Sequence, residues 1–259
     1  MLDEEFSTDG AADFAPSAPP ATAREALTES PWLRQVPAAT LDRLAQQAVL
    51  HRVPAGAVLF EQSETPAFAQ FLIAGCVELI AVDGPTEILI ETALPVDLLL
   101  PAAALNRQPY LARARVRDES QLTLIHADAF RDAVASDHAL CLAVLACQAA
   151  QFRRQVKRTR NLQLRSAEQR VGCYLLQLLE ATPPEAPVRL PLEKRHVAWQ
   201  LGMKRETFSR TLASLAGHGL RVEGDTITIS DIEAVRARFR LDPLIDAPEP
   251  IVPLALGRG

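Results

Sequence analysis

The stretch that most constrains the fold runs from Lys194 to Leu215 and reads KRHVAWQLGMKRETFSRTLASL. Apolar residues recur at three- and four-residue spacing on both sides of Gly202, so the stretch predicts two short helices joined by a tight corner. Ala198 is small enough to let the second helix approach the first. Charged residues gather at the start of the second helix, as in a helix-turn-helix that presents a recognition helix to the major groove of DNA.

The residues around this stretch predict the rest of a winged helix. Two short runs, at 220–222 and 226–229, flank a turn centred on Gly224 and predict a hairpin, the wing. A short strand is expected at 188–190. We therefore expect a winged helix-turn-helix domain over residues 165–241.

The N-terminal part has a different pattern. Residues 1–30 are acidic, rich in Ala, Pro and Ser and poor in large apolar groups, so we expect a disordered tail, because burial could not offset the entropy of ordering. Thr40 can cap a short helix after it. From Val49 to about Ile125, short apolar runs separated by turn residues favour a small barrel or jelly roll. Strands are expected at 58–60, 70–73, 77–82, 87–92 and 122–125.

A helix of ~25 residues is expected after Ser136-Asp137, a capping pair. Its apolar residues form one narrow seam, and such a seam favours pairing with another helix. The simplest partner is a copy of itself, so we predict a parallel homodimer through the 138–160 helix; the alternative is packing within its own chain. Asn161 to Leu164 interrupt the seam and predict a hinge. The seam consists of Leu142, Leu145, Ala149, Phe152, Val156 and Thr159.

The expected fold class is therefore α+β. It combines an N-terminal double-stranded β-helix or jelly-roll barrel, a long dimerisation helix and a C-terminal winged helix-turn-helix. The expected bounds are 1–30 for the disordered tail, 31–135 for the sensory β-barrel domain, 136–164 for the dimerisation helix and hinge, 165–241 for the DNA-binding domain and 242–259 for a flexible tail.

Charge and cysteine usage narrow the function class. The net charge is −5, yet residues 151–220 hold thirteen Lys or Arg and five acids, a local excess that suits nucleic acid. The four cysteines show no CxxC spacing, no signal peptide precedes them, and no apolar run approaches ~18 residues. We expect a cytoplasmic protein without membrane contact. No paired carboxylates, metal-ligand spacing or nucleophile motif stands out, so we do not expect an enzyme.

This arrangement resembles the CRP/FNR family of bacterial transcription regulators over roughly residues 31–240. The most specific part is Lys204 to Arg210, KRETFSR, which satisfies both the R-E-T-x-x-R pattern of CRP-like members and the E-T-x-S-R pattern of FNR-like members. Gly75 matches a barrel-turn glycine of the family. The segments LPLEKRHVAWQLGM and PVDLLLPAAAL are similar to a subgroup associated with nitrogen-oxide or oxygen-related control. The resemblance implies double-stranded DNA and RNA polymerase as partners.

The chemistry of base readout singles out the recognition helix. Arginine can donate two hydrogen bonds to guanine and glutamate can accept from cytosine, so Arg205, Glu206 and Arg210 are expected to read a G·C-containing half-site. Lys204, Thr207 and Ser209 are expected to hold phosphates, which set the register. The alternative is a solvated helix face without a ligand.

The effector is harder to predict. CRP-like receptors bind cyclic nucleotide through a Gly-Glu pair and a later Arg-Ser-Ala, but the corresponding segments here are Leu98 to Ala102 and Tyr110 to Ala112. Arg113 and Arg115 lie close by, but at a different register. We therefore do not expect cyclic AMP as the effector.

The cysteines and histidines bear on iron–sulfur and haem sensing. An iron–sulfur cluster is not expected, because the N-terminal tail contains no cysteine. Haem stays open as a sensor of CO or NO, although no ligand spacing is diagnostic. The axial-ligand candidates are His51, Cys76, His126 and His138.

The predicted function is sequence-specific DNA binding as a homodimer on a pseudo-palindromic site, controlled through the barrel by a signal other than cyclic AMP, such as a haem-bound gas or a redox change. The alternative is a ligand-binding regulatory module of the cyclic-nucleotide type that does not bind DNA.

Overall fold

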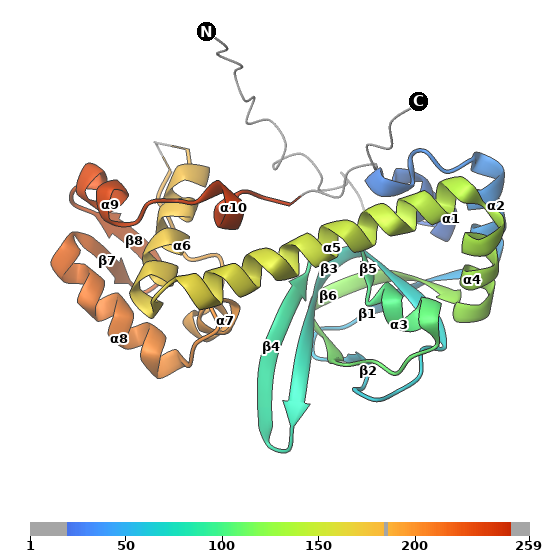
Figure 1. Cartoon of the computed structure of the whole chain (residues 1–259), viewed down its shortest axis with the longest axis horizontal. Coiled ribbons are helices and arrows are strands. Elements are labelled where there is room, and N and C mark those ends of the chain that lie inside the picture. The colour runs from blue at the N-terminus through green and yellow to red at the C-terminus, as the bar shows by residue number, and fades with distance from the viewer. Residues whose placement is uncertain (1–19, 184–185, 250–259) are drawn as a thin grey trace, which may run out of the picture.

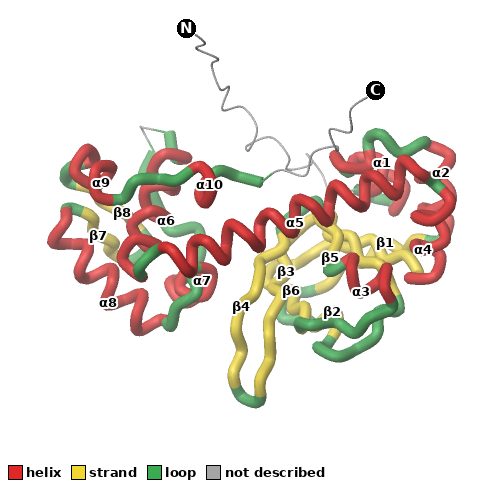
Figure 2. Tube along the Cα trace, in the orientation of Figure 1, coloured by secondary structure: helices red, strands yellow, loops and turns green. Residues whose placement is uncertain are grey.

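A 27-residue helix, α5 (His138–Leu164), runs along the molecule and joins its two domains (Figure 1). In the computed structural model, which describes residues 20–183 and 186–249, a β-sheet domain with covering helices lies at one end of α5 and a helical domain with a small hairpin at the other (Figure 2). The expected fold class is confirmed.

The N-terminal sheet is antiparallel and is built around two long strands. Its order is β1-β6-β3-β4, with β2 paired to β6 and β5 paired to β3. The register of the central pair runs from Phe68 opposite His126 to Ile80 opposite Arg113. The strands are β1 (Ala48–Val53), β2 (Val58–Phe60), β3 (Phe68–Asp83), β4 (Thr86–Ala93), β5 (Asp97–Leu99) and β6 (Arg113–His126).

The strands expected at 70–73 and 77–82 are one continuous strand, β3. Gly75, expected at a turn of the barrel, instead bends this single strand, with φ of +91° and a shift in the β3–β6 register beside it. The Cys76 N–H donates to Ser120 Oγ at 3.0 Å, which secures the bend from the neighbouring strand. Pairing with β6 on both sides keeps the strand intact.

The expected tail over residues 1–30 is wrong for its last third. The segment Ala23–Glu29 forms α1, with Thr22 and Glu25 making a capping box. Ala26 and Leu27 are buried in the core. The average composition of the segment hid these two apolar positions, and the first nineteen residues lie outside the described part.

Short helices close one face of the sheet. The core there is centred on Phe71, which stacks on Trp32 with ring centroids 5.6 Å apart and meets Phe130 edge-on at 5.7 Å. Thr40 does not cap a helix as expected; it lies inside the helix, and its hydroxyl donates to Asp137, the N-cap of α5. These helices are α1, η1 (Pro31–Leu33), α2 (Ala38–Gln46), α3 (Pro101–Asn106) and α4 (Ala127–Ser136).

The long helix has one buried face and one exposed face. Leu140, Val144 and Cys147 are buried against the sheet domain. On the other side four residues of the expected seam are exposed, among them Phe152 at 70% and Leu145 at 53%, whereas Leu142 and Ala149 are half-buried. Packing within the chain therefore uses a different face from the seam.

The hinge expected at Asn161 to Leu164 is wrong in position. These residues continue α5, and the helix ends only at Arg165, whose backbone is extended. Leu162 packs so closely on Gly202 that a Cβ on the glycine would lie 2.4 Å from Leu162 Cδ2. That contact packs the last turn of α5 against the C-terminal domain. The helix therefore ends after this turn, at Arg165.

The C-terminal domain is a winged helix. Its core is centred on Phe208, which is fully buried together with Val197 and Leu215. The residues expected to form a strand at 188–190 make only an isolated bridge between Arg189 and Thr226. The elements are α6 (Ala167–Ala181), α7 (Lys194–Gln200), α8 (Arg205–Leu215), η2 (Ala216–His218), β7 (Leu220–Glu223), β8 (Thr226–Ile229) and α9 (Ile232–Arg238).

The tail expected at 242–259 is wrong for its first eight residues. A short helix, α10 (Pro243–Asp246), forms there, and the chain returns to α5 (Figure 1). Asp242 caps it by accepting from the Leu244 N–H at 2.9 Å. The residues from 250 onward lie outside the described part.

Within the described residues no single helix is both long and apolar enough to cross a membrane. Only α4 and α5 taken together meet the criteria of length and composition, and the chain turns by 113° between them.

The bend at Gly75 gives a stability prediction. A Cβ at this position would lie 2.3 Å from Ser120 Oγ and 2.5 Å from Glu119 O, so Gly75→Ala should lower the free energy of unfolding by ~3 kcal/mol or more. Gly84→Ala is the control, because Gly84 also has a positive φ but its Cβ would meet nothing within 4 Å; it should cost ~1–2 kcal/mol. Urea denaturation measures both, and equal losses would contradict the role given to the contact.

Candidate nucleic-acid interface

Two helices and a glycine corner build the candidate interface. Gly202 has φ of +64°, and the next N–H, that of Met203, donates to Ala198 O at 2.9 Å. This closes α7 and turns the chain into α8. Val197 and Ala198 are fully buried against the domain core, so the position of α8 is fixed by packing.

The recognition helix keeps its polar side chains in solvent. Five of the six predicted site residues are exposed, and Thr207 is half-buried beside the fully buried Phe208. Arg205 and Ser209 are four residues apart, as are Glu206 and Arg210, so each pair shares a side of the helix. The exposed residues are Lys204, Arg205, Glu206, Ser209 and Arg210.

The basic residues at the start of this helix have no ion-pair partner among the described residues. Lys204, Arg205 and Arg210 form no ion pair with any residue in the ranges 20–183 and 186–249, although arginines elsewhere are paired extensively. A cation left free of internal partners can neutralise a phosphate or reach a base edge without first breaking a bond inside the protein.

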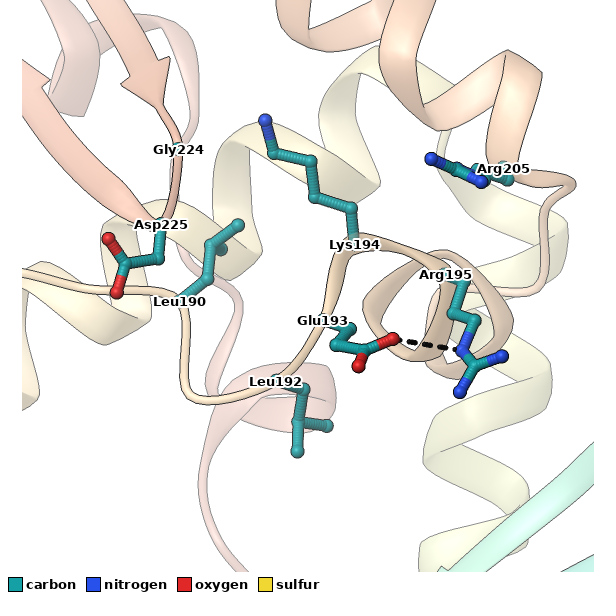
Figure 3. A pocket seen from close by; sticks show the side chains of 8 residues that line it. All are labelled: Leu190, Leu192, Glu193, Lys194, Arg195, Arg205, Gly224 and Asp225. Carbon is teal, nitrogen blue, oxygen red and sulfur yellow. Dashed lines mark ion pairs between the residues drawn. The ribbon is translucent and has the colours of Figure 1, made fainter.

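The structure adds two basic residues that the sequence did not single out. Lys194, at the start of α7, extends between the wing turn at Gly224 and Arg205 (Figure 3) and lines a hollow of about 430 Å³. A second hollow of about 370 Å³ brings Lys194 together with Ser209 and with Arg221 of the wing. The sequence alone could have indicated both residues, because Lys194 is the first residue of the helix-turn-helix stretch and Arg221 lies on a predicted strand of the wing.

Family comparisons agree with this geometry. A model described as the Crp-like helix-turn-helix domain matches residues 169–238, and a model described as the cyclic nucleotide-binding domain matches residues 50–137. Together they cover more than half of the chain.

The chain belongs to the CRP/FNR family of transcription regulators. It therefore has a DNA-binding helix-turn-helix and a cyclic-nucleotide-binding-like domain, as the sequence predicts. No curated protein matches it.

Solved structures match along most of the chain. A protein from Ruegeria pomeroyi described as cyclic nucleotide binding is 26% identical and has a TM-score of 0.53; the match covers 85% of this chain and 98% of that one. The c-di-GMP-responsive global regulator CLP of Xanthomonas campestris is 18% identical, with a TM-score of 0.63 and coverage of 75% and 100%. FixK2 of Bradyrhizobium japonicum is 18% identical, with a TM-score of 0.59 and coverage of 78% and 98%. The last two show likeness of fold alone.

The two segments compared above with the nucleotide contacts of CRP-like receptors, residues 98–102 and 110–112, carry no charged side chain. Tyr110 is buried and stacks on Phe60, with ring centroids 3.6 Å apart, and burial raises its pKa to about 12. Leu100 and Pro101 lie at the start of α3. These segments therefore supply neither a carboxylate for a ribose nor a guanidinium for a cyclic phosphate.

Arg113 and Arg115 do not replace the missing guanidinium. Arg113 donates to Glu61 at 2.7 Å and to Glu87 at 2.6 Å, and Arg115 donates to Glu87 at 3.0 Å and to Glu78 at 3.2 Å. Both arginines are thus committed to carboxylates.

A buried polar cluster connects the sheet domain to α5. Asp97, only 5% exposed, accepts from Gln151 Nε2 at 2.8 Å and pairs with Arg154. Arg154 also donates to Glu91 at 3.0 Å. Removing one partner from such a cluster leaves a buried charge unpaired, so its geometry should respond to anything that shifts the sheet.

The recognition domain also touches the sheet domain directly. Arg158 on α5 donates to Leu89 O of β4 at 2.8 Å and to Gln200 O of α7 at 3.3 Å. His196 Nε2 lies 3.7 Å from the buried carboxylate of Glu78. A movement of β4 would therefore be felt at α7, the helix that supports the recognition helix.

The four haem-ligand candidates do not form one site. His51 lies exposed on β1, His126 is exposed at the end of β6 against Phe68, and His138 begins α5. Cys76 is buried, and burial raises the pKa of its thiol to about 11. No group of three or more metal-binding side chains occurs among the described residues.

Thiol accessibility gives a prediction for this domain arrangement. Cys141 is exposed, whereas burial raises the thiol pKa of both Cys76 and Cys173 to about 11 and also raises that of Cys147. At about pH 8 a disulfide reagent should therefore react quickly with one thiol per folded chain and with all four after unfolding. The Cys141→Ser variant should lose the fast phase; a fast phase that persists in it would contradict the packing.

Proposed function

We propose that this regulator binds a pseudo-palindromic DNA site as a homodimer, with one α8 helix in the major groove of each half-site. The observation that carries the proposal is the set of exposed charges on α8, which form no ion pair with the residues that the structure describes, beside the basic hollows of the wing. Two half-sites read by such helices lie about 34 Å apart, one turn of DNA.

Specificity is assigned to three side chains. Arg205 and Arg210 would each donate two hydrogen bonds to a guanine and Glu206 would accept from a cytosine, which is worth ~1–3 kcal/mol of discrimination for each good contact. Their exposure on the first turns of α8 supports this role, because the N-terminal residues of a recognition helix reach the base edges.

Phosphate contacts are assigned to the residues around this helix. Lys204, Thr207 and Ser209 retain the role expected from sequence, and Lys194 and Arg221 join them because both line the hollows beside α8. Contacts of this kind fix the register and make the affinity strongly dependent on salt.

The dimer is assigned to the exposed face of α5. Leu145, Phe152 and Val156 are 53%, 70% and 42% exposed, and three such side chains on one helix are an apolar stripe that a second copy would bury. Contact with RNA polymerase, implied by the family resemblance, remains part of the proposal.

The signal is proposed to act where the sheet meets α5. The polar cluster at Asp97 and the bridge made by Arg158 give the sheet domain a contact to the helix and to α7. A signal other than cyclic AMP is supported by the absence of charged residues from segments 98–102 and 110–112. An absorption spectrum of the purified protein separates the classes, since a Soret band marks haem and its absence favours a small molecule or a redox change.

The central prediction concerns selectivity. DNA duplexes are first selected from a random library with the wild-type protein, and gel-shift competition is then measured against an unrelated duplex. Arg205→Ala and Arg210→Ala should each lose ~10-fold or more of the selectivity, because each removes a bidentate base contact. Arg236→Ala is the matched control, since Arg236 lies on α9, is half-exposed and pairs with Glu233.

Either of two results would contradict the proposal. If both recognition-helix variants retain the selectivity of the wild type, Arg205 and Arg210 do not read the bases. A wild-type protein that selects no duplex and shows no salt-dependent DNA binding would instead favour the ligand-binding module that does not bind DNA.

A further inference from the structure

The C-terminal segment 242–249 is fixed to the hinge. The Arg165 guanidinium donates to both oxygens of Asp246, at 2.7 and 2.5 Å, and both side chains are less than a tenth exposed. Gln177 on α6 donates to the Asp246 carbonyl at 3.0 Å. Asp246 thus contacts both Arg165, between α5 and α6, and Gln177 on α6.

The segment also runs along the cationic half of α5. Glu249 pairs with Arg153 at 2.5 Å and with Lys157 at 2.6 Å. Asp242 lies 3.7 Å from Arg160. Three acids of the segment therefore offset three cations of α5 and Arg165, the residue that follows the helix.

The helix itself supplies none of this compensation. The sequence of α5 contains no acidic residue, and Arg154 and Arg158 on the same half face the sheet domain instead. A parallel dimer places two copies of this half side by side, and unbalanced like charges would repel across the pair. Arg153 and Arg160 directly follow the seam residues Phe152 and Thr159, so they lie at the edge of that contact.

Leu244 takes no part in these ion pairs and points away from the core. It is 63% exposed, and together with Pro243 it borders a groove of about 270 Å³ whose other wall contains Phe152 and Val156. The segment flanks the seam without covering it, because Phe152 remains 70% exposed. An apolar residue held beside an apolar seam by a charged clamp enlarges the surface that a partner would bury.

We propose that the segment Asp242–Glu249, here called the strap, is part of the homodimer interface of this regulator. Its acids reduce the repulsion between two α5 helices, and Leu244 contacts the seam of a second copy of the chain. The proposal rests on the homodimer proposed above and adds the strap to it.

The test measures dimer dissociation by sedimentation velocity over a range of protein concentrations. Leu244→Asp should weaken the dimer about tenfold or more, because a charge would enter an apolar contact. Leu111→Asp is the matched control, since Leu111 is 81% exposed in the loop before β6, and it should leave the dimer unchanged. Circular dichroism of each variant verifies the fold.

A second variant tests the charges. The triple change Asp242→Asn, Asp246→Asn, Glu249→Gln should also weaken the dimer, and the difference from wild type should shrink between about 0.1 M and about 1 M salt, as the screening length falls from ~10 to ~3 Å. A difference that does not change with salt would contradict the electrostatic part of the proposal.

Phe152→Asp separates the two proposals. If Phe152→Asp abolishes the dimer while Leu244→Asp dimerises like wild type, the strap is not part of the interface, and the proposed dimer through the α5 seam is supported. Tighter dimers in the strap variants would also overturn the proposal, because the strap would then obstruct the seam. A wild-type chain that stays monomeric at all concentrations overturns the homodimer and the strap together.

Discussion

The structure depends on how the cations of α5 are balanced. One helix without a single acidic residue joins the two domains, and its cationic half needs partners from elsewhere in the chain. Asp97 and Glu91 of the sheet domain form ion pairs with Arg154, whereas Asp246 forms an ion pair with Arg165 between α5 and α6. Because these acids belong to the sheet domain and to the C-terminal strap, the helix is positioned by electrostatics as well as by packing.

This arrangement separates binding from control. The recognition helix is placed by apolar packing around Phe208 and keeps its charges free, whereas the contacts that could carry a signal are polar and shared between domains. Packed apolar contacts hold one geometry. A buried ion pair has a large free-energy cost when it is broken, so a shift that separates its partners favours a different arrangement of the two elements it joins. In this account a shift of the sheet would alter the position of α8 and leave its internal structure unchanged.

Patterns within short segments of the sequence predicted the elements whose stabilising contacts lie within those segments. The helix-turn-helix, the wing and the cap at Asp137 follow from spacing and capping rules, and the structure confirms them. The misplaced features depend on distant contacts: α1 forms because Leu27 is buried in a core made by later residues, and the hinge moves to Arg165 because Leu162 packs on Gly202. The strap depends on ion pairs between residues about 80 to 100 positions apart, which no local pattern reveals.

The mass of the protein–DNA complex, measured by native mass spectrometry on a selected duplex, tests the dimeric binding mode most directly. Two chains are expected on each duplex at saturation, since two α8 helices must reach two half-sites one helical turn apart. A single chain bound to the duplex with undiminished selectivity would contradict it.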